Sequence, residues 1–330
     1  MNRVTPEAVL ELARNFMESR ILLSGAELNL FTILTPVPLS AQEVATKIGG
    51  NLRALTILLD ALAALGFLVK RGEAYQCPPS VTPFLSTDTH KSVLPMVLHM
   101  ASLWWKWSGL TSVVRGSQTS DKAAVSSEGA DELRAFIGAM DVIATGLAPQ
   151  IVAAVNPGSS KALLDVGGGS GTYTLAFLQA APGMKATLFD RPEVIKIARQ
   201  RLGEAGALSR VTLVAGDFYR DELPEGHDLA FVSAIIHQNS PKENLNLFVK
   251  VFRSLVPGGR IVVRDHVMEP DRTHPKEGAV FAVNMLLSTS GGRTYTYDEI
   301  KAGLAQAGFI SIRLLQKGEH MDGLVEAFKP

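Results

Sequence analysis

From about residue 161 onward, short runs of Val, Ile and Leu alternate with helical segments, and this alternation restricts the fold more than any other feature. Such a pattern is typical of a doubly wound α/β domain, in which helices cover both faces of a parallel sheet. The predicted parallel strands fall in residues 161–167, 185–190, 210–218, 227–236 and 260–267. The sequence therefore predicts an open α/β sheet over residues 161–330.

The end of the chain departs from this alternation. Residues 309–318 and 323–330 read as two strands with no helix between them. Strands joined by so short a connection pair in antiparallel fashion, so we expect a C-terminal hairpin at the sheet edge.

The first half of the chain is mainly helical. Residues 38–50 predict a short helix with Ser40 as N-cap and Glu43 three residues later. Residues 53–67 carry leucines at helical spacing, and 67–77 predict a hairpin around Arg71-Gly72. Two helices followed by a hairpin outline a winged helix.

These patterns divide the chain into three parts. We predict a helical winged-helix domain over 1–115, a linker and connecting helix over 116–160, and the α/β domain over 161–330. The linker includes a loop at 117–130, where small and polar residues dominate.

Composition excludes several kinds of partner. Lys plus Arg number 32 and Asp plus Glu number 32, so the chain has no net positive charge with which to bind nucleic acid or an anionic membrane. The longest apolar stretch, 55–69, contains Asp60 and is too short to span a bilayer. One cysteine, Cys77, and an N-terminus without the apolar core of a signal peptide favour a cytoplasmic protein.

A glycine-rich loop, Gly167-Gly168-Gly169-Ser170-Gly171, follows the first predicted strand of the sheet. Ligands of open α/β sheets bind at such loops, beyond the carboxyl ends of the strands. The loop lacks the lysine of a triphosphate site, and a dinucleotide site would need glycine at Thr172. Asp165 would repel a pyrophosphate but suits an amino group or a positive charge.

The next two strands also end in residues suited to a nucleoside. Asp190 can accept hydrogen bonds from ribose hydroxyls. Asp217 can accept from an adenine amine, and Phe218 can pack on the base. We therefore expect an adenosine with a zwitterionic or cationic tail and no phosphates.

Six segments in order, "LLDVGGGSGTY", "LFDRPEV", "AGDFY", "SAIIHQNSPKENL", "LVPGGRIVVRDHV" and "GGRTYTYDEI", resemble the motifs of S-adenosylmethionine-dependent O-methyltransferases. The resemblance is to the group that includes plant caffeic-acid-type enzymes and bacterial antibiotic and pigment enzymes, and it spans the whole chain. It implies a Rossmann-like class I methyltransferase domain and S-adenosyl-L-methionine as cofactor. It also implies a homodimer formed through the N-terminal domain. Asp165, Gly167, Gly169, Asp190, Asp217 and Phe218 would bind the cofactor.

His237 follows the predicted strand 227–236, at the ligand-facing edge of the sheet. An imidazole there could remove a proton near neutral pH, or could simply cap the strand end. The resemblance implies the first role, that of general base. Asp265 ends the next strand and either orients this imidazole or caps its own strand.

Two positions depart from the family pattern. Gln238-Asn239 follow the base where Asp-Trp is usual, and Thr294 stands where a glutamate usually flanks the base. Glu299 is close in sequence, but with Thr296 it forms a predicted capping box. These changes leave room for a more acidic acceptor. They also leave open a relative that methylates nitrogen or carbon, or that uses the cofactor for other chemistry.

The acceptor should be a small hydroxylated aromatic molecule bound in an apolar pocket. Candidate pocket residues, each of which could equally belong to an ordinary core, are Met100, Trp104, Trp105, Trp107, Met140, Phe281 and Met285. Ser233 either holds the methionine end of the cofactor or is an ordinary strand-end serine. Asp265, His266 and His274 have no recognisable metal-ligand spacing, so we expect no metal.

A DNA-binding regulator is the alternative that a winged helix raises. The helix over 53–67 would then be the recognition helix, but it offers Leu and Ala where base readout needs Arg, Asn or Gln. Its apolar face instead favours burial against a partner subunit.

Overall fold

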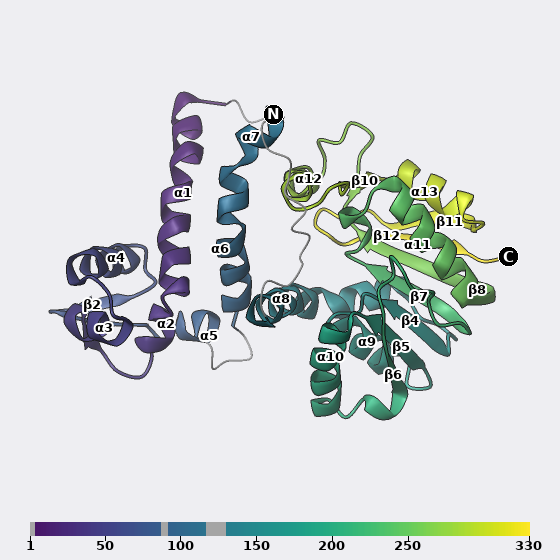
Figure 1. Cartoon of the computed structure of the whole chain (residues 1–330), viewed down its shortest axis with the longest axis horizontal. Coiled ribbons are helices and arrows are strands. Elements are labelled where there is room, and N and C mark those ends of the chain that lie inside the picture. The colour runs from purple at the N-terminus through teal and green to yellow at the C-terminus, as the bar shows by residue number, and fades with distance from the viewer. Residues whose placement is uncertain (1–3, 87–91, 117–129) are drawn as a thin grey trace. The chain divides into compact units, whose positions relative to one another are not determined.

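The computed structural model describes residues 4–86, 92–116 and 130–330, and the chain divides into two compact units, Met1–Trp105 and Lys106–Pro330 (Figure 1). Most of the predicted loop at 117–130 lies outside the described residues. The three-part division at residues 115 and 160 remains a prediction.

The first unit is mainly helical, with one small three-stranded sheet. Its elements are α1 (Pro6–Glu27), α2 (Leu30–Ile33), β1 (Leu39–Ser40), α3 (Ala41–Ile48), α4 (Leu52–Ala64), β2 (Val69–Arg71), β3 (Ala74–Gln76), α5 (Thr82–Leu85) and α6 (Leu94–Ser108), the last of which runs on into the second unit. The strands pair in the order β1-β3-β2, and all pairs are antiparallel.

Local chemistry explains the winged-helix arrangement. The Ser40 side chain accepts the backbone N–H of Glu43, whose carboxylate accepts the Ser40 N–H in return, so the predicted capping box is present. Gly49 ends α3 in the left-handed conformation, at φ 64°. Leu55, Leu59 and Leu62 of α4 are buried in this unit's own core, beside Phe31. The apolar face of α4 is therefore covered within the chain, and the expectation that it packs on a partner subunit was wrong.

The second unit is the α/β domain. Its elements are α7 (Leu110–Val114), α8 (Ala130–Val155), β4 (Ala162–Val166), α9 (Thr172–Ala180), β5 (Lys185–Asp190), α10 (Pro192–Glu204), η1 (Leu208–Arg210), β6 (Val211–Ala215), β7 (His227–Ser233), η2 (Ile236–Gln238), α11 (Pro241–Ser254), β8 (Leu255–Asp265), β9 (Val267–Met268), α12 (Lys276–Ser288), β10 (Tyr295–Thr296), α13 (Tyr297–Gln306), β11 (Ile310–Gln316) and β12 (Gly323–Phe328).

A seven-stranded sheet with the order β11-β12-β8-β7-β4-β5-β6 forms the centre of this unit. Strands β4, β5, β6, β7 and β8 pair in parallel. Strand β12 pairs with both β8 and β11 in antiparallel fashion, so the predicted C-terminal hairpin is confirmed. The order changes direction at β4, and this switch point places the ligand-binding edge at the carboxyl ends of β4 and β7.

Helices cover both faces of the sheet (Figure 1). On one face, α11 and α13 pack their buried residues on Leu164 and Val166 of β4. On the other face, α8, α9 and α10 pack around Leu163 and Phe231. Neighbouring residues of one strand thus enter different cores, as the two-residue repeat of a strand requires.

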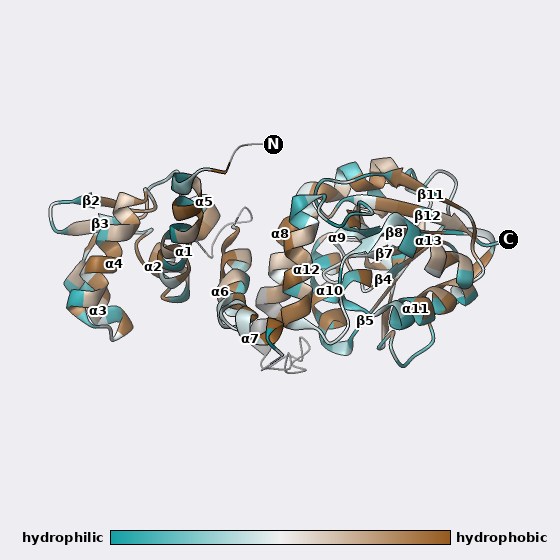
Figure 2. Ribbon diagram, turned by 90° about the horizontal axis from the view of Figure 1, so that it is seen from above, coloured by the Kyte–Doolittle hydropathy of each residue, from teal (hydrophilic) through white to brown (hydrophobic). Residues whose placement is uncertain are grey.

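Helix α8 contains a segment, Phe136–Val155, that is long and apolar enough to cross a membrane by length and composition. Figure 2 shows apolar residues, in brown, along much of this helix. Ala148, Ile151, Val152 and Val155 are buried against Phe177 and its neighbours. The C-terminal part of α8 therefore belongs to the core of the second unit.

Candidate active site at the carboxyl edge of the sheet

His237 and Asp265 lie in direct contact at the carboxyl edge of the sheet. His237 belongs to η2, just beyond β7, and Asp265 ends β8, which is the parallel neighbour of β7. The His237 Nδ1 atom lies 3.0 and 2.9 Å from the two carboxylate oxygens of Asp265. Asp265 is 1% exposed and His237 is 9% exposed. Because a carboxylate only accepts, Nδ1 carries the proton in this contact, and in the neutral ring Nε2 is then an acceptor.

Opposing effects act on the Asp265 carboxyl. Burial alone would raise its pKa, but the charge and hydrogen bond of His237, together with His266, hold the pKa below its usual range. Asp265 therefore stays ionised and can stabilise a positive charge on the His237 ring.

The segment that carries His237 is held by buried amides. Asn239 donates its side-chain amide to Asn244 Oδ1 at 2.9 Å, and Asn244 donates its own to the Ile236 carbonyl at 2.9 Å. The Tyr295 hydroxyl donates to the Asn239 carbonyl at 2.5 Å. Sequence reasoning treated Asn239 only as a departure from the family pattern, and this anchoring role was missed.

The Gly-Gly turn before Thr294 packs directly on this segment. A Cβ on Gly292 would lie 2.6 Å from the His237 carbonyl oxygen and 2.9 Å from that of Gln238, so only glycine fits there. Thr294 is 3% exposed. Glu299 accepts the Thr296 N–H at 2.9 Å in the predicted capping box, and it pairs with Arg272 and Arg293. Glu299 is thus occupied at the start of α13, as expected.

The aromatic ring of Phe281 lies between two histidines. Phe281, on α12, meets His237 edge to face at 4.8 Å between ring centroids, and it lies 5.0 Å from the His266 ring. Burial is the main cause that lowers the pKa of His266, which favours its neutral form.

The glycine-rich loop turns tightly between β4 and α9. Gly167, Gly169 and Gly171 have φ of 67°, 56° and 86°, which glycine tolerates best. A Cβ on Gly168 would come within 2.6 Å of the Leu188 side chain. Around Gly169 no atom lies within 4 Å of such a Cβ, so the backbone there faces open space.

Two carboxylates flank this loop, Asp165 buried and Asp190 half-buried. Asp190 accepts the N–H groups of Gly169 at 2.8 Å and of Arg191 at 2.7 Å. Asp165 accepts the Thr174 hydroxyl at 2.6 Å. Burial raises the pKa of Asp165 to about 6, and burial also raises the pKa of Asp190. Both carboxyls are therefore costly to keep ionised without further partners.

Asp217 and Phe218 lie just after β6. Asp217 accepts the Tyr219 N–H at 2.9 Å, and its side chain is 38% exposed. The Phe218 ring packs on that of Tyr219, with centroids 4.5 Å apart. Lys250 Nζ donates to the Phe218 carbonyl at 2.8 Å and fixes the turn.

Ser233 ends β7, opposite Arg264 in the parallel register. Its hydroxyl oxygen accepts Arg264 Nη1 at 2.9 Å. The Arg264 guanidinium lies 5.2 Å above the ring of Tyr173, the second residue of α9. Arg264 was missed by sequence reasoning, although a lone arginine inside the apolar run "RIVVRDHV" is a visible signal.

A second polar cluster ties the glycine-rich loop to two helices. The Asp141 carboxylate on α8 accepts the Ser170 hydroxyl at 3.2 Å and the Thr172 hydroxyl, and it pairs with Arg201 of α10. Arg201 Nη1 also donates to Ser170 at 2.9 Å. A cavity of about 530 Å³ opens beside this cluster and is lined in part by Lys196.

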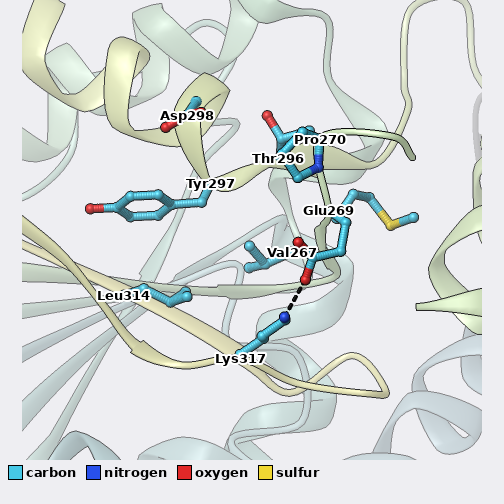
Figure 3. Close-up of a pocket in the computed structure, with 9 residues that line it drawn as sticks. Val267, Glu269, Pro270, Thr296, Tyr297, Asp298, Leu314 and Lys317 are labelled. Atoms are coloured by element: carbon cyan, nitrogen blue, oxygen red, sulfur yellow. Dashed lines mark ion pairs between the residues drawn. The ribbon is translucent and has the colours of Figure 1, made fainter. Parts of the chain in front are cut away.

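A smaller cavity of about 230 Å³ lies beside β9 and α13 (Figure 3). Glu269 and Lys317 form an ion pair at its side, and the Tyr297 hydroxyl donates to the Ile312 carbonyl at 3.1 Å. None of the predicted site residues lines it.

The predicted acceptor-pocket residues are divided between the units. Trp107 Nε1 donates to Asn284 of α12 at 3.1 Å, and Met285 on the same helix is 7% exposed. Met100, Trp104 and Trp105 belong to the first unit, where Trp105 is 81% exposed. Met140 is half-buried on α8. Of the predicted set, Phe281 contacts the base directly.

Comparison with known families gives two matches. Residues 124–310 match the O-methyltransferase domain, and residues 10–81 match the O-methyltransferase dimerisation domain. The first match covers more than half of the chain.

Individual relatives support the same family. The chain is 31% identical over 317 residues to the tetracenomycin polyketide synthesis 8-O-methyl transferase of Streptomyces glaucescens, covering 93% of this chain and 92% of that protein. It is 27% identical to the 3-hydroxy-5-methyl-1-naphthoate 3-O-methyltransferase of Streptomyces sahachiroi, with 94% and 91% covered. The solved structure of PigF with SAH superposes with a TM-score of 0.87 at 25% identity, covering 99% of this chain and 100% of that one.

The sheet order and these matches define the class, which is that of the S-adenosylmethionine-dependent methyltransferases. Within that class, the chain belongs to the O-methyltransferase family whose members pair the catalytic domain with an N-terminal dimerisation domain. It is an enzyme that methylates a small molecule on oxygen.

Proposed function

We propose that this enzyme transfers a methyl group from S-adenosylmethionine to the hydroxyl of a small aromatic molecule, with His237 as general base. The observation that carries this proposal is the buried pair of His237 and Asp265, with Nδ1 at 2.9 Å from the carboxylate. This pair leaves His237 Nε2 as the acceptor for the hydroxyl proton.

The pair acts in a simple sequence. Nε2 of His237 takes the proton from the acceptor hydroxyl as the oxygen becomes nucleophilic, and the ionised Asp265 stabilises the resulting imidazolium. A positioned base of this kind supplies about 10²–10⁴-fold in rate. Alignment of the two reactants supplies about 7–11 kcal/mol more.

The residues around the glycine-rich loop fit the cofactor. The loop backbone at Gly169 faces open space, the Asp190 carboxylate stands beside it, and the partly exposed Asp217 and Phe218 are suited to an adenine. We assign the cofactor to Asp165, Gly167, Gly169, Asp190, Asp217, Phe218 and Ser233. Bound there, S-adenosylmethionine supplies an electrophilic methyl group on a sulfonium.

Two observations favour an aromatic acceptor. The Phe281 ring meets His237 edge to face, so an acceptor whose oxygen reaches Nε2 lies close to an aromatic surface. One relative is named as acting on a hydroxynaphthoate and another on a tetracenomycin polyketide. Thr294 in place of an acid leaves Asp265 as the carboxylate in contact with His237, which favours a relatively acidic hydroxyl.

We also propose that the enzyme is a cytoplasmic homodimer joined through its N-terminal domain. The dimerisation-domain match at residues 10–81 supports the dimer. Helix α1 also leaves large apolar side chains exposed, among them Leu12 at 76% and Phe16 at 53%.

Methyl-labelled S-adenosylmethionine tests the proposed reaction. We expect the purified enzyme to label the phenolic oxygen of hydroxylated naphthoic acids and to leave matched aromatic amines unlabelled. His237→Ala should abolish this turnover while S-adenosylhomocysteine affinity, measured by calorimetry, stays nearly unchanged. Label on nitrogen or carbon, or equal loss of turnover and affinity, would contradict the proposal.

A further inference from the structure

Arg264 is a buried cation without an acidic partner among the described residues. It is 3% exposed, and its Nε and Nη2 atoms are enclosed without a hydrogen-bond partner in the part of the chain that the structure describes. The ion pairs there do not include Arg264, whereas Arg260, on the same strand, pairs with Glu326 at 2.9 Å. An uncompensated buried charge is costly, so a functional reason for Arg264 is needed.

The neighbours of Arg264 point to an anion. Its Nη1 donates to the Ser233 oxygen, so the Ser233 hydroxyl hydrogen points away from the guanidinium, toward another acceptor. The Tyr173 ring lies under the guanidinium, and its hydroxyl is buried close to the Ser233 side chain. Of Ser233, Tyr173 and Arg264, Ser233 is the partly exposed residue, and Arg264 is buried.

The set stands at the switch point of the sheet. Ser233 lies opposite Arg264 at the end of β7, and β7 is the neighbour of β4, from which the glycine-rich loop departs. Ala234 follows with φ 56°, a strained value for alanine, and its N–H donates to the Arg264 carbonyl at 2.8 Å. The backbone thus holds Ser233 and Arg264 in fixed register beside the loop.

We propose that Arg264 is a positioning residue for the cofactor: through Ser233, it directs a hydrogen bond and positive charge at the carboxylate of the amino-acid tail of S-adenosylmethionine. This proposal rests on the placement of the cofactor at the glycine-rich loop. A donor hydroxyl polarised by a guanidinium binds an anion more strongly than a neutral serine does. Tyr173 adds an aromatic face that holds the guanidinium in place.

Two ligands separate tail binding from binding of the rest of the cofactor. S-adenosylhomocysteine carries the amino-acid tail, and 5′-methylthioadenosine is the same adenosine thioether without it. We expect Arg264→Met to weaken S-adenosylhomocysteine binding about 10- to 100-fold, the range for hydrogen bonds to charged groups. Methylthioadenosine affinity should stay unchanged in calorimetry on the full chain, and Arg264→Lys should recover part of the loss.

Arg260→Met is the control, because it removes a half-buried arginine from the same strand and should weaken neither ligand. If Arg264→Met fails to fold, Ser233→Ala provides the test. It should weaken the binding of S-adenosylhomocysteine and leave the binding of methylthioadenosine unchanged. The proposal falls if either site variant weakens both ligands equally or weakens neither. Oxygen methylation by the wild-type enzyme is measured separately, so failure here is distinct from failure of the proposed function.

Discussion

At the scale of single residues, the site is a set of buried polar groups whose cost is offset by specific partners. Asp265 is fully buried, yet His237 and its hydrogen bonds hold the Asp265 pKa low. Asp165 is nearly as buried, but the hydrogen bonds it accepts from Thr174 do not outweigh its burial, so its pKa rises to about 6. Asp165 on β4 and Asp265 on β8, two strands separated by β7, therefore differ in charge behaviour because their partners differ.

The raised pKa of Asp165 predicts a pH dependence of stability. Between about pH 4 and pH 6 the native state keeps a proton that the unfolded state has released, so the free energy of unfolding falls as pH rises through the native pKa. Asp165→Asn replaces the titrating carboxyl group with an amide that does not titrate. Urea unfolding at pH 4 and at pH 7 should show the variant gaining about 2 kcal/mol on the wild type over this range. A pH-independent difference would show that Asp165 does not titrate as described.

The sequence identified candidate residues at the ends of strands but not the side chains that hydrogen-bond to them or hold them in place. Position alone placed His237 and Asp265 together, because the carboxyl ends of neighbouring parallel strands meet at one edge. Thr174, Arg264 and Asn239 escaped it, since their roles depend on which side chains the packing brings within hydrogen-bond reach.

At the scale of elements, the turn from β7 into η2 decides where the base stands. Ala234 adopts φ 56° at this turn, which glycine tolerates and alanine resists. The strain is maintained by the Ala234 hydrogen bond to β8 and by the anchoring of η2 through Asn239 and Asn244. The element is thus held in position at a cost to stability, as is common at functional sites.

Ala234→Gly should relieve this strain. We expect it to raise the free energy of unfolding by about 0.5–1 kcal/mol, since the left-handed conformation costs alanine more than glycine loses in chain entropy. Ala230→Gly is the control: it lies in regular strand β7, is fully buried, and should destabilise by about 1 kcal/mol or more. Chemical denaturation compares the two, and a loss of stability in both would refute the strain at Ala234.

The type of each element was easier to predict from the sequence than the elements it packs against. Strand β5 was predicted to the residue, and the capping boxes at Ser40 and Thr296 are present, because both signals are local. Helix α12 was not predicted as a helix, although it carries Phe281 to the base. Its weak amphipathic pattern gives little local signal, and its role arises from tertiary contact.

At the scale of the whole molecule, the two units bury their own cores and still leave an apolar surface. Helix α1 buries Leu23 and Ala26 near its end but exposes Val9, Leu12 and Phe16 along its length. An exposed apolar helix on a domain that matches a dimerisation domain favours a subunit interface there.

The double variant Leu12→Glu/Phe16→Glu should therefore convert the proposed homodimer into a monomer, because it places charges in an apolar contact. Light scattering coupled to gel filtration measures the mass. Val114→Glu, which alters a 71% exposed valine outside the matched dimerisation segment, should leave the dimer intact. A wild-type monomer, or a double variant that remains dimeric, would count against α1 as the interface.

The most direct test of the account is how the loss in His237→Gln depends on the acidity of the acceptor. Two hydroxylated aromatics of the same skeleton are compared in single-turnover methyl transfer, one neutral and one already ionised at the assay pH. With the neutral acceptor, the variant should be about 10²–10⁴-fold slower than the wild type. With the ionised acceptor, most of that loss should disappear, because no proton remains to be removed. An equal loss with both acceptors would show that His237 is not the base.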